Sequence, residues 1–165
     1  MRDFKGKVAV ITGAASGIGR AIVDALATEG SRLVLADIEE QPLRATERHL
    51  LDHGAEVLAV RTDVSNASEV DALAHKTLER FGSVDLLFNN AGVGGGSLVW
   101  ESTLADWTWI LGVNLQGVIH GIHTFVPIML EQGTEGHIVN TASVTGLISP
   151  PGMGPYNDSK HAVVD

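Results

Sequence analysis

The sequence predicts an α/β fold, a single domain built on a doubly wound parallel sheet. Short apolar runs alternate with amphipathic helical segments along all 165 residues, a pattern typical of parallel strands linked by crossover helices. Glycines follow the first apolar run, and polar residues follow the later ones. In parallel sheets these positions meet at one edge, where ligands bind. Right-handed crossovers then predict the strand order 3-2-1-4-5.

The first half of the chain predicts three strands and three helices in alternation. The expected strands are Val8–Thr12, Arg32–Asp37 and Glu56–Asp63. The expected helices, which carry apolar residues on one face, are Gly17–Glu29, Gln41–His53 and Asn66–Phe81. Ser65 is the expected N-cap of the third helix.

The second half predicts strands at Asp85–Asn89 and His137–Ala142, a long helix over Leu104–Glu131, and a helix beginning at Tyr156. Pro127 would bend the long helix. This helix contains an uncharged stretch, which raises the possibility of a membrane span. Its polar residues argue instead for a core or subunit-interface helix, since lipid would penalise them. They are Asn114, Gln116, His120, His123 and Thr124, and Pro127 adds to the same argument.

Composition narrows the possible functions. The chain has no cysteine, which excludes disulfides and Cys-ligated metals and fits a cytoplasmic protein. Its net charge of −9 and the lack of a basic cluster argue against a nucleic-acid partner. Ten of the eleven Lys and Arg residues lie at or before Arg80, so Lys160 is the one ammonium group in the second half. His120 and His123 have no acidic neighbour and are interpreted as core or interface residues rather than metal ligands.

Tyr156 and Lys160 are four residues apart, so on a helix they share one face. A tyrosine can act as a base near neutral pH where a nearby ammonium stabilises its phenolate form. Ser143 lies thirteen residues before Tyr156 and can supply a hydroxyl to hold a substrate oxygen. This spacing indicates proton-transfer chemistry.

The glycine-rich turn after the first strand indicates a nucleotide site. Gly13, Gly17 and Gly19 have the spacing G-x3-G-x-G, which would let the backbone approach a pyrophosphate at a helix N-terminus. The alternative is a tight turn that binds nothing. Asp37 ends the second strand, where an acid binds the ribose hydroxyls of NAD and repels the phosphate of NADP. Asp37 could also be a helix-capping acid.

Together these motifs resemble the short-chain dehydrogenase/reductase family. The residues that carry the resemblance are Thr12–Gly19, Asn89–Gly92, Ser143, Tyr156 and Lys160, in that order. The resemblance implies a Rossmann-like fold and an NAD-dependent oxidoreductase that moves a hydride between an alcohol or ketone substrate and nicotinamide. It also implies a homo-oligomer, a dimer or tetramer paired through the long helix.

The resemblance assigns roles residue by residue. The implied catalytic residues are Ser143, Tyr156, Lys160 and Asn114, the last supporting a proton relay. The implied cofactor-binding residues are Gly13, Ser16, Gly17, Ile18, Gly19, Asp37, Asp63, Val64, Asn90, Ala91, Gly92, Tyr156 and Lys160. Alternatives remain: Asp63 could cap a turn, Asn90 could be a turn residue, and Asn114 could be a packing residue.

Two features depart from the family pattern. Asp158 lies between Tyr156 and Lys160, where the family usually has a small or apolar residue; we expect it in the first helical turn, pointing away from both. The sequence also stops at Asp165, before the family's sixth strand. A truncated, non-catalytic dinucleotide-binding module is therefore the alternative function. Trp100, Met153 and the loop Gly94–Ser97 are candidates to line a substrate pocket.

Overall fold

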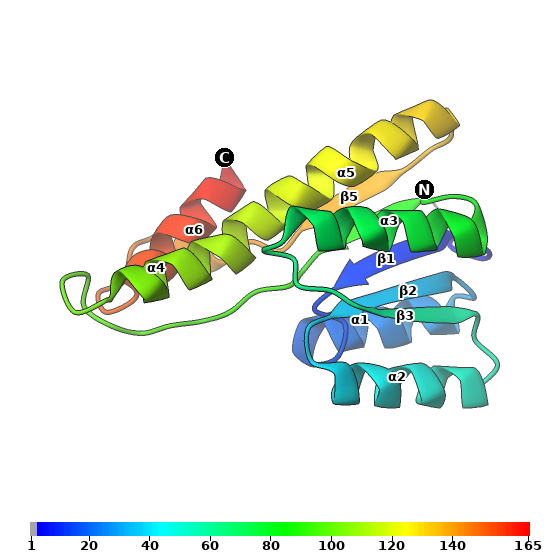
Figure 1. The fold of residues 1–165 in the computed structure, drawn as a ribbon, viewed down its shortest axis with the longest axis horizontal. Helices are drawn as coiled ribbons and strands as arrows, with labels where there is room; N and C mark the ends of the chain where they lie inside the picture. Colours follow the sequence, from blue (N-terminus) through cyan, green and yellow to red (C-terminus); the bar gives the residue numbers. More distant parts are fainter. Residues whose placement is uncertain (1–2) are drawn as a thin grey trace.

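The computed structural model describes residues 3–165, which form one parallel sheet with helices on both faces (Figure 1). The strands are β1 (Val8–Thr12), β2 (Arg32–Asp37), β3 (Val57–Arg61), β4 (Leu86–Asn89) and β5 (His137–Asn140). They lie in the order β3-β2-β1-β4-β5, and every neighbouring pair is parallel. The strand order expected from the sequence is confirmed.

Six helices connect or follow these strands. They are α1 (Gly17–Thr28), α2 (Glu40–Asp52), α3 (Ala67–Phe81), α4 (Leu104–Leu111), α5 (Gly117–Gln132) and α6 (Gly154–Val164). Helices α1 and α2 cover one face of the sheet, and α3 and α5 cover the other (Figure 1). Helices α4 and α6 contact each other and extend beyond the sheet.

The central strand β1 is buried along its whole length because both of its faces are covered. Its side chains alternate between two apolar cores. Val10 packs in the core that contains Phe125 of α5, whereas Ile11 packs in the core that contains Leu43 of α2. The continuous apolar run of β1 thus holds both helical layers on one sheet.

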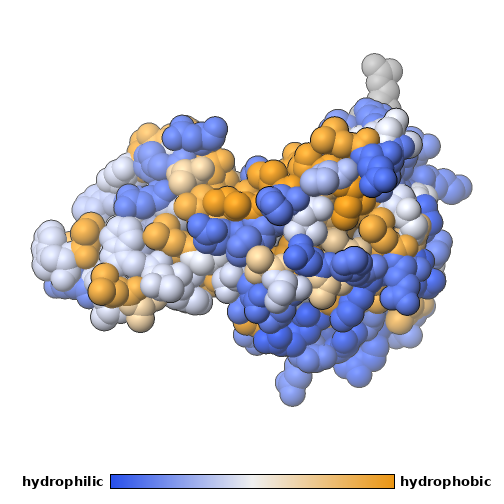
Figure 2. All heavy atoms as spheres, turned by 45° about the horizontal axis from the view of Figure 1, so that its top comes forward, coloured by the Kyte–Doolittle hydropathy of each residue, from blue (hydrophilic) through white to orange (hydrophobic). Residues whose placement is uncertain are grey.

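The edge strand β5 is exposed at all four residues. Ile138 and Val139 expose 40% and 42% of their surface. Helix α5 lies beside β5, and apolar side chains gather on this face of the molecule (Figure 2). The large hydrophobic residues that these two elements leave exposed are Ile119, Ile122, Leu130, Ile138 and Val139. We call this set the α5/β5 surface.

The expected single long helix is interrupted. A π-helical segment, η1 (Gly112–Gln116), separates α4 from α5, and there the N–H of Gly117 bonds to the carbonyl of Gly112, five residues back. Helix α5 continues through Pro127. The departure from α-helical geometry is therefore centred on Asn114, a placement common for π segments at functional sites.

The segment Leu104–Gln132 is long and apolar enough to cross a membrane, by length and composition alone. Its polar side chains nevertheless bind inside the protein. His120 Nδ1 lies 2.9 Å from the Val64 carbonyl oxygen, and Thr124 donates to the Asp71 carboxylate at 2.7 Å. These contacts attach the helix to its own domain, and among residues 3–165 no three potential metal ligands cluster around either histidine.

Two helix starts differ from expectation. Asn66, not Ser65, caps α3, because Ser65 donates both its N–H and its hydroxyl to Asp63. Helix α6 begins at Gly154 with a proline in its first turn, two residues earlier than expected. Asp158 is consequently outside the first turn, and it is exposed.

Candidate active site

A cleft of about 1030 Å³ runs along the C-terminal ends of the five strands. Its wall contains residues that follow each strand in turn, as expected for a doubly wound sheet. The volume is at the upper end of the range for small-molecule sites. Most of the expected site residues line it: Gly13, Ser16, Gly17, Ile18, Asp37, Asp63, Val64, Asn90, Ala91, Gly92, Ser143, Tyr156 and Lys160. Gly19 and Asn114 lie behind the wall.

The glycine turn needs its glycines for two different reasons. Gly13 and Gly17 have φ values of +66° and +54°, which L side chains rarely adopt. Gly19 has an ordinary φ, but a Cβ there would lie 2.0 Å from the Gly13 carbonyl oxygen. Gly19 therefore allows α1 to pack closely on the turn, while the surroundings of Gly17 are open.

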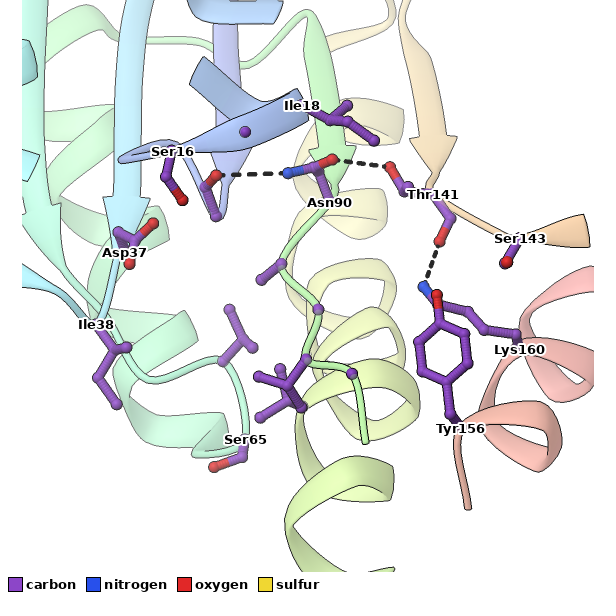
Figure 3. A pocket seen from close by; sticks show the side chains of 18 of the residues that line it. Ser16, Ile18, Asp37, Ile38, Ser65, Asn90, Thr141, Ser143, Tyr156 and Lys160 are labelled. Carbon is purple, nitrogen blue, oxygen red and sulfur yellow. Dashed lines mark hydrogen bonds between the residues drawn. The ribbon is translucent and has the colours of Figure 1, made fainter. Parts of the chain in front are cut away.

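The N-terminus of α1 faces this cleft (Figure 3). Ser16 is its N-cap residue, yet its side chain makes no capping hydrogen bond. The hydroxyl of Ser16 is thus available beside the unpaired backbone N–H groups of the first turn. Such a helix start attracts anionic groups, phosphates in particular.

Asp37 fastens the glycine turn to β2. One carboxylate oxygen accepts a hydrogen bond from the Ala15 N–H at 2.9 Å, and the other accepts from the Glu39 N–H at 3.0 Å. Asp37 is thus a turn residue and not the N-cap of α2, which is Glu39, and the same carboxylate also lines the cleft. Among the residues in the cleft wall, no Lys or Arg lies beside it; the one basic side chain is Lys160, across the cleft (Figure 3).

Asp63 and Val64 follow β3. Asp63 accepts two hydrogen bonds from Ser65, at 2.9 and 2.7 Å, so the turn-capping alternative for Asp63 is seen in the structure. Val64 is 6% exposed and lines the cleft next to it. One charged and one apolar group thus face the same end of the cleft as Asp37.

Asn90 connects three strand ends (Figure 3). Its backbone N–H donates to the Thr12 hydroxyl at 3.0 Å, and its side-chain amide donates to the Thr12 carbonyl at 3.1 Å. Its amide oxygen accepts from the Thr141 hydroxyl at 3.2 Å. Thr12 and Thr141 were not expected as site residues; their position as the polar residues ending β1 and following β5 is the signal that could have identified them.

Lys160 reaches the same network from α6. Its Nζ donates to the Thr141 carbonyl oxygen at 2.7 Å and lies 5.8 Å from the centroid of the Tyr156 ring. Lys160 is only 5% exposed, and this burial lowers the pKa of its ammonium. A cation is thereby held against the face of the tyrosine, next to the cleft (Figure 3).

Ser143 lies across from Tyr156 at the start of the short helix η2 (Val144–Gly146). Its hydroxyl oxygen accepts a weak hydrogen bond from the Thr145 N–H at 3.3 Å. The proton of that hydroxyl remains available to the cleft. The structure thus brings Ser143, Tyr156 and Lys160 to one end of the cleft.

Asn114 supports this end from behind the wall. It is 1% exposed, and its side chain both accepts from the Val93 N–H at 2.8 Å and donates to the Val93 carbonyl at 2.9 Å. It also donates to the hydroxyl of Ser159, which in turn donates to the Tyr156 carbonyl. Asn114 therefore joins η1, α6 and the loop after β4.

The cleft wall also contains the apolar side chains of Trp109, Val113 and Met153. Of the residues expected to line a substrate pocket, Met153 and Gly94 line the cleft, whereas residues 95–97 do not. Trp100 is 79% exposed and is not part of it. The tryptophan in the wall is Trp109, which helix α4 carries to this position.

The comparisons with known proteins agree with this geometry. A sequence model of the short chain dehydrogenase family matches residues 7–165. The chain is 44% identical to a CLA biosynthesis dehydrogenase/reductase from Lactiplantibacillus plantarum, covering 99% of the chain and 57% of that protein. It is 42% identical to levodione reductase from Leifsonia aquatica, and this match covers 98% of the chain and 61% of that protein.

Solved structures of related proteins are also similar to this chain in fold and sequence. A short chain dehydrogenase/reductase from Burkholderia phymatum, solved in complex with NAD, matches with a TM-score of 0.98 and 60% identity, covering 99% of this chain and 58% of that one. The chain therefore spans about three fifths of the length of these relatives.

Proposed function

The chain belongs to the short-chain dehydrogenase family, and from that premise we propose that it forms the nucleotide-binding and proton-transfer part of an NAD-dependent oxidoreductase. The proposed substrate is a small alcohol or ketone. The single observation that carries the proposal is the buried Lys160 ammonium beside the Tyr156 ring, in the wall of a cleft that also contains the glycine turn and Asp37.

The cleft residues fit a dinucleotide. The glycine turn offers open backbone at Gly17 and the free hydroxyl of Ser16 for a diphosphate. Asp37 would bind the adenosine ribose and disfavour a 2′-phosphate, since no basic side chain in the wall lies beside it. Asp63 and Val64 would border the adenine.

The remaining cofactor roles belong to the middle of the cleft and its far end. Asn90, Ala91 and Gly92 would line the path toward the nicotinamide, and Lys160 would hold the nicotinamide ribose. Ile18, which is 64% exposed, would cover the dinucleotide from the side of α1. Gly19 would act indirectly, by keeping α1 close to the glycine turn.

The chemistry at the other end is a proton transfer. Bound NAD would supply the hydride acceptor. During alcohol oxidation, the proton of the substrate hydroxyl passes to the Tyr156 oxygen, and Lys160 stabilises the phenolate that accepts it. The Ser143 hydroxyl donates to the substrate oxygen and fixes its position. Asn114 holds the loop and the helix that carry these groups, and we propose that it supports the proton relay beyond Lys160.

Replacement of Tyr156 by Phe tests this proposal. The change removes the proposed acid/base and keeps the ring that Lys160 contacts. Turnover of a secondary alcohol should fall by about 10²–10⁴-fold, the usual contribution of general acid–base catalysis, while NAD affinity by calorimetry stays nearly unchanged. Residual activity close to wild type would move the role elsewhere. NAD binding without turnover in the wild-type protein would favour the non-catalytic binding module.

We also propose that the protein is a cytoplasmic homo-oligomer, built from dimers paired through the long helix. The exposed apolar residues of the α5/β5 surface and the internal hydrogen bonds of His120 and Thr124 support a protein partner for this face rather than lipid. No nucleic acid or metal is part of the proposal.

A further inference from the structure

The ammonium group of Lys160 is positioned by a backbone carbonyl of another element. Its Nζ donates a hydrogen bond of 2.7 Å to the carbonyl oxygen of Thr141, the first residue after β5. A lysine has a long, flexible stem, so helix α6 fixes where the Lys160 side chain begins but not where its ammonium ends. Because Lys160 is only 5% exposed, the place of its ammonium beside Tyr156 depends on the place of this carbonyl.

Thr141 is itself held by two hydrogen bonds besides the one from Lys160. Its backbone N–H donates to the Asn89 carbonyl at 3.0 Å, which continues the pairing of β5 with β4. Its hydroxyl donates to the Asn90 side-chain oxygen at 3.2 Å (Figure 3). The hydroxyl thus attaches the end of β5 to the residue that follows β4.

The side-chain amide of Asn90 is fixed in one orientation. Its NH₂ group donates to the Thr12 carbonyl at 3.1 Å and lies against the glycine turn, where a Cβ on Gly19 would be 2.6 Å from its nitrogen. The amide oxygen therefore faces Thr141, and because this oxygen can only accept, the Thr141 hydroxyl is the donor. A path of hydrogen bonds thus leads from the glycine turn to the ammonium of Lys160 (Figure 3).

From this path we infer that Thr141 is a positioning residue: its hydroxyl holds in place the carbonyl that binds the Lys160 ammonium beside the Tyr156 ring. The inference rests on the proposed function, in which this ammonium stabilises the tyrosine phenolate. It assigns the placement of the ammonium to the strand ends and the glycine turn as well as to α6. Loss of the Thr141 hydroxyl should therefore loosen Lys160 without altering either residue of the Tyr156–Lys160 pair.

Thr141→Val tests the inference because it removes the hydroxyl and keeps the branched shape of the side chain. The rate at which acetic anhydride acetylates Lys160 is measured by peptide mass spectrometry, relative to the exposed Lys76 of the same molecule. Loss of a neutral hydrogen bond shifts a local opening equilibrium by about 2- to 10-fold, so the relative rate for Lys160 should rise by that factor. An unchanged relative rate would overturn the inference.

Two further variants separate the hydroxyl from other effects of substitution. Thr141→Ser restores a hydroxyl at the same position and should keep the wild-type labelling rate. Thr145→Val is the matched control, because it makes the same change nearby, but within the described part of the chain the Thr145 hydroxyl has no hydrogen-bond partner. It should leave the labelling of Lys160 unchanged. Equal increases in Thr141→Val and Thr145→Val would indicate general loosening of the fold and contradict the inference.

A spectroscopic measurement reports whether Lys160 still acts on Tyr156. The sequence contains one tyrosine, so tyrosinate absorbance in the folded protein arises from Tyr156 alone. At about pH 9, below the ordinary titration range of tyrosine, this absorbance should be lower in Thr141→Val than in wild type and lower still in Lys160→Met, because a nearby ammonium favours the phenolate. The absorbance of Thr141→Ser should equal that of wild type.

The two measurements separate the inference from the proposed function. If Lys160→Met leaves the tyrosinate absorbance unchanged, the proposed action of Lys160 on Tyr156 fails, and the labelling rate still decides whether Thr141 holds Lys160. If Lys160→Met lowers the absorbance but Thr141→Val changes neither absorbance nor labelling, the proposed chemistry stands and Thr141 is not a positioning residue. Faster labelling in Thr141→Val with unchanged absorbance would also contradict the inference, because Thr141 would then retain Lys160 without placing it for Tyr156.

Discussion

Asp37 serves the fold and the proposed cofactor site with the same carboxylate. Its two oxygens accept from the amides of Ala15 and Glu39, and each oxygen keeps further lone pairs for a ligand hydroxyl. Replacement of Asp37 by Ala removes the negative charge at this point. The affinity ratio of NAD to NADP should fall about tenfold, because a hydrogen bond to a charged group contributes about 1.5–3 kcal/mol. Calorimetry with both nucleotides measures the ratio.

Asp37→Asn provides the control for this experiment. The amide oxygen can still accept from one backbone N–H, so much of the turn remains while the charge is lost. If the charge of Asp37 decides the preference for NAD, the Asn and Ala variants should lower the affinity ratio of NAD to NADP by the same factor. An Asn variant that keeps the full wild-type preference would assign the effect to turn geometry instead.

Lys160 predicts a pH dependence of stability. Burial lowers the pKa of its ammonium below the ordinary value of 10.5, so between the lowered pKa and 10.5 the unfolded chain binds this proton more strongly than the folded chain. Stability from this group therefore rises with pH across that window. The free energy of unfolding of wild type minus that of Lys160→Met should increase toward pH 10.5, as measured by urea denaturation.

The hydrogen bond from Lys160 to the Thr141 carbonyl is missing from Lys160→Met at every pH. Its loss shifts the two stability curves apart by an amount that depends little on pH, so the slope of the difference is the informative quantity. A difference that stays flat or decreases with rising pH would show that the ammonium is not desolvated in the folded protein.

At the scale of elements, the close approach of α5 to β4 depends on one glycine. A Cβ on Gly121 would lie 2.1 Å from the Asn89 side-chain oxygen, and Asn89 is itself bonded to Asn140 on β5. Gly121→Ala should lower the free energy of unfolding by about 1–3 kcal/mol, the usual cost of overpacking. Chemical denaturation measures the loss.

Gly112 is the matched control because it lies in the same helical segment. A Cβ there would meet only the Ser65 Cβ, at 3.4 Å, which is ordinary contact. Gly112→Ala should be neutral or stabilise by up to about 1 kcal/mol, since alanine favours helix. Equal losses for the two variants would mean that the glycines act through backbone freedom rather than close packing.

Strands and helices were predictable where the chain repeats a simple pattern. The apolar run of β1 and the glycine that follows α2, Gly54, mark element ends that the structure confirms within a few residues. The π segment was not predictable, because it is centred on Asn114, whose partners Val93 and Ser159 are distant in sequence. Helix periodicity contains no information about such contacts.

In the candidate site, too, some residues could be predicted from sequence patterns and others depend on contacts between distant parts of the chain. The glycine turn and the Tyr156–Lys160 pair could be predicted from the sequence because each has a characteristic spacing. The bridge from Thr12 through Asn90 to Thr141 was only partly visible, since single threonines are common and their role depends on strand order. Once the order of the sheet is known, its polar strand ends identify the bridge.

At the scale of the whole molecule, the α5/β5 surface predicts self-association. Ile122 lies on this surface and is 38% exposed. Ile122→Glu places a charge in the proposed dimer contact and should weaken the dimer at least about tenfold, because a buried unpaired charge is costly. Sedimentation velocity over a range of protein concentrations measures the change.

Leu51→Glu on α2 is the control, since Leu51 is 52% exposed and belongs to the layer on the opposite face of the sheet. It should leave association unchanged. A wild-type protein that stays monomeric at high concentration would contradict the proposed assembly, and equal effects of both variants would point to general solubility instead.

The position of β1 also has a consequence for how the protein is made. This strand is synthesised before the other four strands of the sheet but stands at its centre, between β2 and β4. Ribosomes add about 5–20 residues per second, so its β4 partner emerges roughly 4–15 seconds later. Until then the VAVIT segment, buried at every residue in the finished fold, has one open edge. Nascent chains stalled before residue 86 should therefore recruit chaperones at this segment, and chains released after β4 should not.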